Sequence, residues 1–189
     1  LPGGMTGRIG LDIFLRNPLI LYANIENANK PGMSDADREK ELRAGKASQG
    51  MVGEEVYRTD DGGKTWKKVS PEKQTVGGGP GYYYMDIRVD PNDANHVYVL
   101  TVGVQESKDG GKTWARAFQF GGDNHALWID PANSKHMILG YDHGMGITFD
   151  GGTAWYHPDE LPLAQLYAVG YDHQVPYNVY GGLQDNGSV

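Results

Sequence analysis

The sequence has 189 residues, among them 24 acidic and 17 basic ones, a formal net charge of −7, and no cysteine. An acidic chain without a long basic run is a poor partner for nucleic acid or for an anionic membrane surface, and a chain without cysteine forms no disulfide or thiolate site. No stretch reaches the roughly 20 apolar residues of a membrane helix. The 28 glycines and 10 prolines favour tight turns and short strands, so we expect an all-β chain.

A strand–turn–strand element opens the chain as GRIGLDIFLRNPLILYANI from Gly7, and it recurs from Tyr82, from Ala126 and from Leu166. Proline presets the backbone for a turn, and a preceding aspartate or asparagine can fold its side chain onto that turn. We therefore predict a pair of antiparallel strands in each copy. In the first three copies the turns fall at Asn17-Pro18, Asp90-Pro91 and Asp130-Pro131.

The segment 27–53 interrupts this pattern. Ser34 followed three residues later by Asp37 resembles a capping box, and Gly45 is suited to end a helix. We expect a short helix on a loop. Its many charges favour a solvated helix, and the length of the loop leaves a lid or a contact surface as the alternative.

One octapeptide occurs three times, as TDDGGKTW from Thr59, SKDGGKTW from Ser107 and TFDGGTAW from Thr148. The aspartate can fold its carboxylate onto backbone N–H groups of the turn, the Gly-Gly pair supplies positive φ, and the tryptophan can bury beneath. The third copy departs from the others at Thr153-Ala154, where they have Lys-Thr. We interpret the following residues as structural: Asp61, Trp66, Asp109, Trp114, Asp150 and Trp155.

Together the two elements make a four-stranded antiparallel unit, strands A to D, of about 40 to 45 residues, which is the size of a β-propeller blade. Because rings have about four to eight blades, we expect a partial propeller over residues 1–189. It would hold about three and a half blades of a seven- or eight-bladed ring, completed by a longer chain or by another chain. The expected bounds are about 7–70 with the insertion 27–53, 82–118, 126–157, and a half blade at 166–189.

The octapeptides resemble the Asp box, or bacterial neuraminidase repeat, of sialidases, sortilin-type receptors and xyloglucan-degrading glycoside hydrolases. The phrases GRIG, GDNHALWIDP and GGLQDNGS are similar to large bacterial proteins with sortilin-like propellers, many of them labelled glycosyl hydrolase. The resemblance implies a propeller within a larger exported protein, periplasmic or secreted. The arginine triad of sialidases is not assignable in this span, and the acids of the xyloglucan hydrolases do not map onto positions here.

Strand alternation places the A–B and C–D turns on one face of the disc, and the B–C turns and the links between blades on the opposite face. The Asp boxes are C–D turns, so unusual polar residues on the opposite face are the candidates for function. Each also suits ordinary turn chemistry. We expect a ligand-binding rim there, formed by Arg8, Asp123, Asn124, His125, His143, Gln184 and Asn186, with Asp142 and Asp185 as candidate catalytic carboxylates.

Two chemistries fit these residues. Asp142 and Asp185 can act as the two carboxylates of glycoside hydrolysis, one as acid and one as base or nucleophile. His125 and His143 with Asp123 or Asp142 can instead hold a divalent metal ion, but no spacing here is a specific metal motif, so we expect no cofactor.

The preferred interpretation is a propeller module that binds a protein, peptide or glycan on the face opposite the Asp boxes. One alternative is a glycoside hydrolase that uses carboxylates of that rim. Another is an architectural subunit that docks through segment 27–53. The expected partners are the remainder of the propeller and a glycan or protein ligand, without nucleic acid and without membrane insertion.

Overall fold

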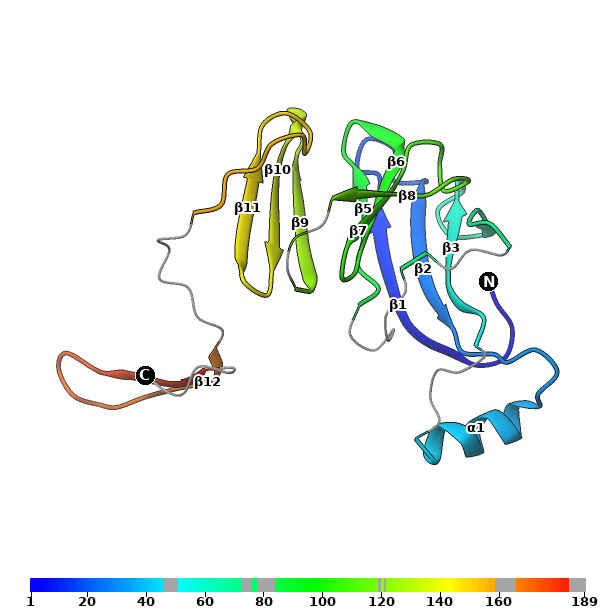
Figure 1. Cartoon of the computed structure of the whole chain (residues 1–189), viewed down its shortest axis with the longest axis horizontal. Coiled ribbons are helices and arrows are strands. Elements are labelled where there is room, and N and C mark those ends of the chain that lie inside the picture. Colours follow the sequence, from blue (N-terminus) through cyan, green and yellow to red (C-terminus); the bar gives the residue numbers. More distant parts are fainter. Residues whose placement is uncertain are drawn as a thin grey trace. The chain divides into compact units, whose positions relative to one another are not determined.

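A computed structural model of the chain describes residues 1–45, 51–72, 76–77, 84–118, 120, 122–158 and 166–183. The chain divides into two compact units, Leu1–His157 and Pro158–Val189. Among the described residues, the first unit holds three antiparallel sheets and one helix, and the second holds one hairpin (Figure 1).

The first two sheets are four-stranded, and each strand pairs with its neighbour along the chain. The first sheet contains β1 (Thr6–Ile13), β2 (Leu21–Asn27), β3 (Gly53–Thr59) and β4 (Lys67–Lys68). The second contains β5 (Ile87–Asp90), β6 (Asp93–Leu100), β7 (Val104–Ser107) and β8 (Ala115–Phe118). All of these pairs are antiparallel, which confirms the predicted four-stranded blades.

The third sheet has three full strands, β9 (Asn124–Asp130), β10 (Asn133–Tyr141) and β11 (Gly144–Thr148). In place of the expected fourth strand, Tyr156 makes a single bridge to Ile147, with both N–H to oxygen distances at 2.8 Å. Pro158 follows two residues later and has no N–H to continue the pairing. The second unit is the hairpin of β12 (Leu166–Tyr171) and β13 (Val179–Leu183), so the described sheets amount to about three and a half blades.

The cores lie between consecutive sheets. Because successive side chains of a strand point to opposite faces, β6 supplies both interfaces of the middle blade. Val97 and Val99 are fully buried against the first sheet, while Tyr98 and Leu100 are buried against the third. Face-to-face packing of this kind holds the blades of a propeller in register.

The insertion contains helix α1 (Asp35–Arg43), and the side chain of Ser34 accepts the N–H of Asp37 at 3.2 Å as its N-cap. The helix is less solvated than its charges suggest. Arg38 is 1% exposed, and its Nε donates to the carbonyl of Ala28 at 2.8 Å. This buried guanidinium ties α1 to the residue that follows β2.

Each Asp box is closed by its own aspartate. Asp109 accepts the backbone N–H of Thr113 at 2.9 Å and the Thr113 hydroxyl at 2.6 Å, and Asp61 makes the same two bonds to Thr65. In the third box Asp150 accepts the N–H of Ala154 at 3.0 Å, but alanine has no hydroxyl to offer. The tryptophan indoles donate to the carbonyl of the second glycine, at 3.1 Å for Trp66, 2.8 Å for Trp114 and 3.0 Å for Trp155.

In the second and third boxes, the second glycine also lies against the blade before it. A Cβ on Gly111, where φ is +97°, would lie 2.5 Å from a methyl group of Val69, just after β4. A Cβ on Gly152 would lie 3.2 Å from the ring of Phe118 in β8. Glycine is therefore required there both by backbone conformation and by the close approach of the neighbouring blade.

Candidate functional site

Hydrogen bonds tie each Asp box to the A–B turn of its own blade. The first glycine of each box, Gly62, Gly110 and Gly151, donates its N–H at 2.9 Å to the carbonyls of Leu19, Asn95 and Lys135, respectively. The C–D and A–B turns thus share one face, the Asp-box face. The start of β9 and the turn between β10 and β11 belong to the opposite face.

On that opposite face three candidate residues come together, and we call them the Asp–His cluster: Asp123, His125 and Asp142. Asp123 precedes β9, His125 is the second residue of β9, and Asp142 follows the last residue of β10. Tyr141 is the cross-strand partner of Asn124, so the sheet register brings the two segments side by side. One ligating atom of each residue lies within 4.8 Å of the others.

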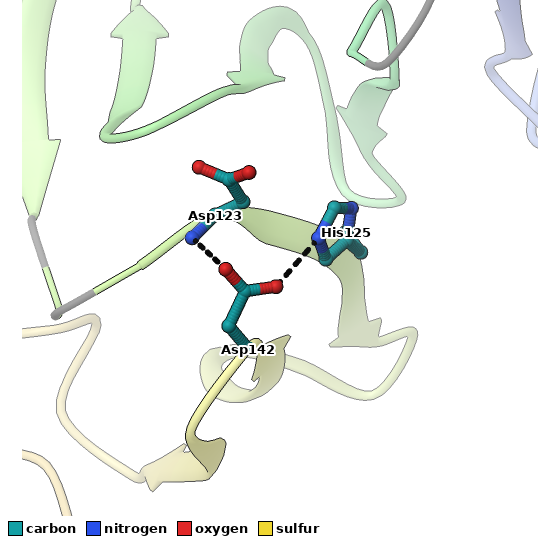
Figure 2. Close-up of side chains that lie close together, drawn as sticks. All are labelled: Asp123, His125 and Asp142. Carbon is teal, nitrogen blue, oxygen red and sulfur yellow. Dashed lines mark hydrogen bonds and ion pairs between the residues drawn. The ribbon is translucent and has the colours of Figure 1, made fainter. Parts of the chain in front are cut away.

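The two oxygens of Asp142 hold the cluster together (Figure 2). Oδ1 lies 3.0 Å from Nε2 of His125, and Oδ2 accepts the backbone N–H of Asp123 at 3.0 Å. The N–H of Asp142 in turn donates to the carbonyl of Asp123 at 3.0 Å. The side chains of His125 and Asp142 are 39% and 38% exposed, so the cluster is both ordered and open to solvent.

The electrostatics favour an ionised Asp142. The N–H of Asp123 lowers the pKa of this carboxyl most, burial partly opposes it, and the hydrogen bond from His125 lowers the pKa further. An ionised carboxylate beside an imidazole can accept hydrogen bonds from a ligand, bind a cation, or act as a base.

The backbone beside the cluster requires a glycine at position 122. Gly122 has φ +92°, and a Cβ at this position would lie 2.9 Å from Cβ of Asp142. A larger residue would displace Asp142 from the N–H of Asp123, so glycine is a condition of the geometry.

The remaining candidates do not all join the cluster. Asn124 differs from its expected ligand-binding role, because it is 1% exposed and its Nδ2 donates to the carbonyl of Thr101 at 2.7 Å, which links the middle and third blades. Its side chain points away from Asp123 and His125 because neighbouring strand residues alternate. His143 is exposed beside Asp142 but supplies no ligating atom to the cluster, and Arg8 is exposed on β1 of the first sheet. Gln184, Asp185 and Asn186 lie outside the described residues.

The BNR/Asp-box repeat family matches residues 57–68, which cover the end of β3, the first octapeptide and β4. These residues form the closed turn between two strands of a four-stranded blade. The described residues therefore have the fold of a partial β-propeller with Asp boxes. No curated protein sequence matches it.

Solved structures resemble the propeller in fold. A GH74 enzyme from Niastella koreensis aligns with a TM-score of 0.56 and 16% identity over 94% of this chain and 27% of that one. A GH74 xyloglucanase from Xanthomonas campestris aligns with a TM-score of 0.55 and 15% identity over 93% of this chain and 26% of that one. YCF48 from Cyanidioschyzon merolae aligns with a TM-score of 0.49 and 15% identity over 83% of this chain and 38% of that one. The propeller thus spans about a quarter of the two GH74 chains, and a likeness at this identity shows fold and not chemistry.

One feature of the propeller was missed from the sequence: a histidine or asparagine six residues after the aspartate of the A–B turn. His96 Nδ1 lies 3.4 Å from Asp90, and its Nε2 lies 3.0 Å from Glu106. The same spacing gives His136 on Asp130 at 3.1 Å and Asn178 on Asp172 at 2.8 Å. The recurrence at i and i+6 was visible in the aligned copies, and it marks the Asp-box face as structural.

The hairpin of the second unit also has a hollow, lined by Tyr171, Asp172, His173, Gln174 and Tyr177. It lies at an A–B turn, and its carboxylate already closes that turn, because Asp172 accepts the N–H groups of Gln174 at 3.1 Å and Asn178 at 2.9 Å.

Within the described residues, no helix is long and apolar enough to cross a membrane.

Proposed function

We propose that this propeller is a ligand-binding module whose ligand docks on the face opposite the Asp boxes. The observation that carries the proposal is the Asp–His cluster. The Asp-box aspartates accept hydrogen bonds from the turns that they close. Asp142 instead pairs with His125 from a neighbouring strand, and both side chains are held in place while more than a third exposed. Ordered polar groups on an accessible face are what binding sites use to orient a ligand.

The chemistry of the cluster indicates the kind of ligand. Two carboxylates within a chain of net charge −7 repel an anionic partner and attract donors of hydrogen bonds. A glycan offers hydroxyl groups, and a basic peptide offers ammonium and guanidinium groups. The export that the family resemblance implies would place such a ligand outside the cytoplasm, and this location stays part of the proposal.

The hydrolase alternative is less well supported by the same carboxylate. Glycoside hydrolysis needs one proton donor with a raised pKa and one ionised partner. Because its pKa is lowered, Asp142 suits the base or nucleophile and not the proton donor. The other candidate, Asp185, lies outside the described residues. The architectural alternative rests on α1, which Arg38 fixes to the first blade.

A binding screen tests the proposal. The whole protein is applied to glycan and basic-peptide arrays, and each hit is titrated against wild type, Asp142→Asn and His125→Gln. Lys64→Ala is the matched control, because Lys64 is an exposed charge on the Asp-box face. We expect the two cluster variants to weaken binding about tenfold or more, the loss of one strong polar contact, and Lys64→Ala to leave it unchanged. The proposal is contradicted by a ligand that binds both cluster variants as tightly as wild type, or by a screen in which no glycan or peptide binds.

A further inference from the structure

The Asp–His cluster combines the side chains that hold transition-metal ions, one imidazole and two carboxylates. They lie at one end of the paired strands β9 and β10, so the sheet fixes their spacing. Figure 2 shows the imidazole of His125 directed at Asp142, with the carboxylate of Asp123 turned away from the pair.

The spacing of the central pair suits a metal ion. Bonds of about 2.1 Å from a divalent ion to nitrogen and oxygen place two adjacent ligands of an octahedron about 3.0 Å apart. Nε2 of His125 and Oδ1 of Asp142 are 3.0 Å apart. The proton of the hydrogen bond lies on the line between these two atoms, whereas an ion bound to both lies off that line, so a rotation of the His125 ring lets an ion replace the proton. A rotation of the Asp123 side chain then brings in a third ligand.

The supporting contacts are those that metal sites need. The N–H of Asp123 occupies Oδ2 of Asp142 and orients the carboxylate, so that Oδ1 faces His125. Gly122 provides the space in which Asp142 lies. Groups that orient a ligating carboxylate or imidazole raise the affinity of a site for metal by roughly ten- to a hundredfold.

We propose that Asp123, His125 and Asp142 bind a divalent transition-metal ion on the face opposite the Asp boxes. Imidazole favours zinc, and the two carboxylates suit manganese, whereas magnesium and calcium prefer sites made of oxygen ligands alone. Three protein ligands on an exposed edge leave coordination positions open to water or to a hydroxyl or carboxylate of a docked molecule. This use of the ion in recognition rests on the proposed function, whereas the metal site itself does not.

Calorimetry on the whole protein tests the site. After dialysis against EDTA and its removal at pH 7, the protein is titrated with Zn²⁺, with Mn²⁺ and, for comparison, with Mg²⁺. We expect one equivalent of Zn²⁺ or Mn²⁺ to bind and Mg²⁺ to bind far more weakly. Asp142→Asn and His125→Gln should each weaken binding about tenfold or more. His143→Gln is the matched control, because it removes an adjacent exposed imidazole outside the cluster, and it should change affinity less than about twofold.

A second measurement covers the case in which a variant does not fold. Bound Mn²⁺ should broaden the ring signals of His125 in the NMR spectrum of the wild-type protein before those of His96 and His136, which lie on the Asp-box face. No heat and no selective broadening would show an ordinary hydrogen-bonded pair and overturn the proposal. So would a loss on His143→Gln equal to that on His125→Gln. Metal binding without any hit on the glycan and peptide arrays would contradict the proposed ligand-binding function but not the metal site.

Discussion

The hydroxyl of Thr113 is expected to be a measurable part of the stability of the second blade. It donates to Oδ2 of Asp109 at 2.6 Å, while the N–H of the same residue donates to Oδ1 at 2.9 Å. A hydrogen bond to a charged group contributes about 1.5–3 kcal/mol, and solvent exposure of the pair reduces this to about 1 kcal/mol. For a chain of this size, that corresponds to a fall in melting temperature of about 2–4 °C.

Thermal melts followed by tryptophan fluorescence check this value. Thr113→Ala should lower the melting temperature at pH 7, and Thr113→Ser, which keeps the hydroxyl, should retain most of the stability. The bonds from Thr113 lower the pKa of Asp109 to about 2. A lowered pKa gives stability that is present above the ordinary value of about 4 and is lost as pH falls towards 2. The gap between wild type and Thr113→Ala should therefore close below pH 4. Equal melting at pH 7, or an equal loss in Thr113→Ser, would refute the reasoning.

Three further expectations follow from the contacts. Ala154→Thr should raise the melting temperature, because it restores the hydroxyl that the third box lacks; melts of the single variant check this, and an unchanged temperature argues against it. Met137→Ala should cost about 2–5 kcal/mol in urea unfolding, because Met137 is fully buried between the middle and third blades. Burial alone would lower the pKa of His96, but its bonds to Asp90 and Glu106 outweigh burial and raise it. The stability from protonated His96 is therefore present below about pH 6.5 and lost as pH rises above it, and His96→Gln should flatten that decline in melts from pH 6 to 8.

Much of the fold was predictable because its signals are local. An octapeptide that contains its own hydrogen-bond acceptor, its two positive-φ glycines and its buried indole needs no distant partner to be recognised. The strand–turn–strand element is equally local. Tyr156 shows the limit, because whether a short polar stretch extends into a fourth strand depends on the prolines that follow and on the neighbouring edge.

The candidate site was only partly predictable. Strand alternation was enough to place Asp123, His125 and Asp142 on one face, but the register that pairs Tyr141 with Asn124 decides which of them touch. That register depends on packing across the sheet, which a single sequence does not display. For the same reason the sequence alone does not show that Asn124, which lies between Asp123 and His125, faces the core.

The contact of the second and third Asp boxes with the blade before each of them has a consequence for how such a protein can be cut and rebuilt. The second glycine of each of these boxes lies against a side chain at or just after the end of the last strand of the blade before it, Val69 or Phe118. A single sheet that is excised at its own ends therefore loses a packing contact on each side. The unit that can be moved with its contacts intact is therefore not one sheet, because it also includes the last strand of the preceding blade. Circular permutants and blade insertions of this propeller should therefore tolerate breaks at the B–C turns better than breaks between Trp66 and Val69, the residue that contacts the next Asp box.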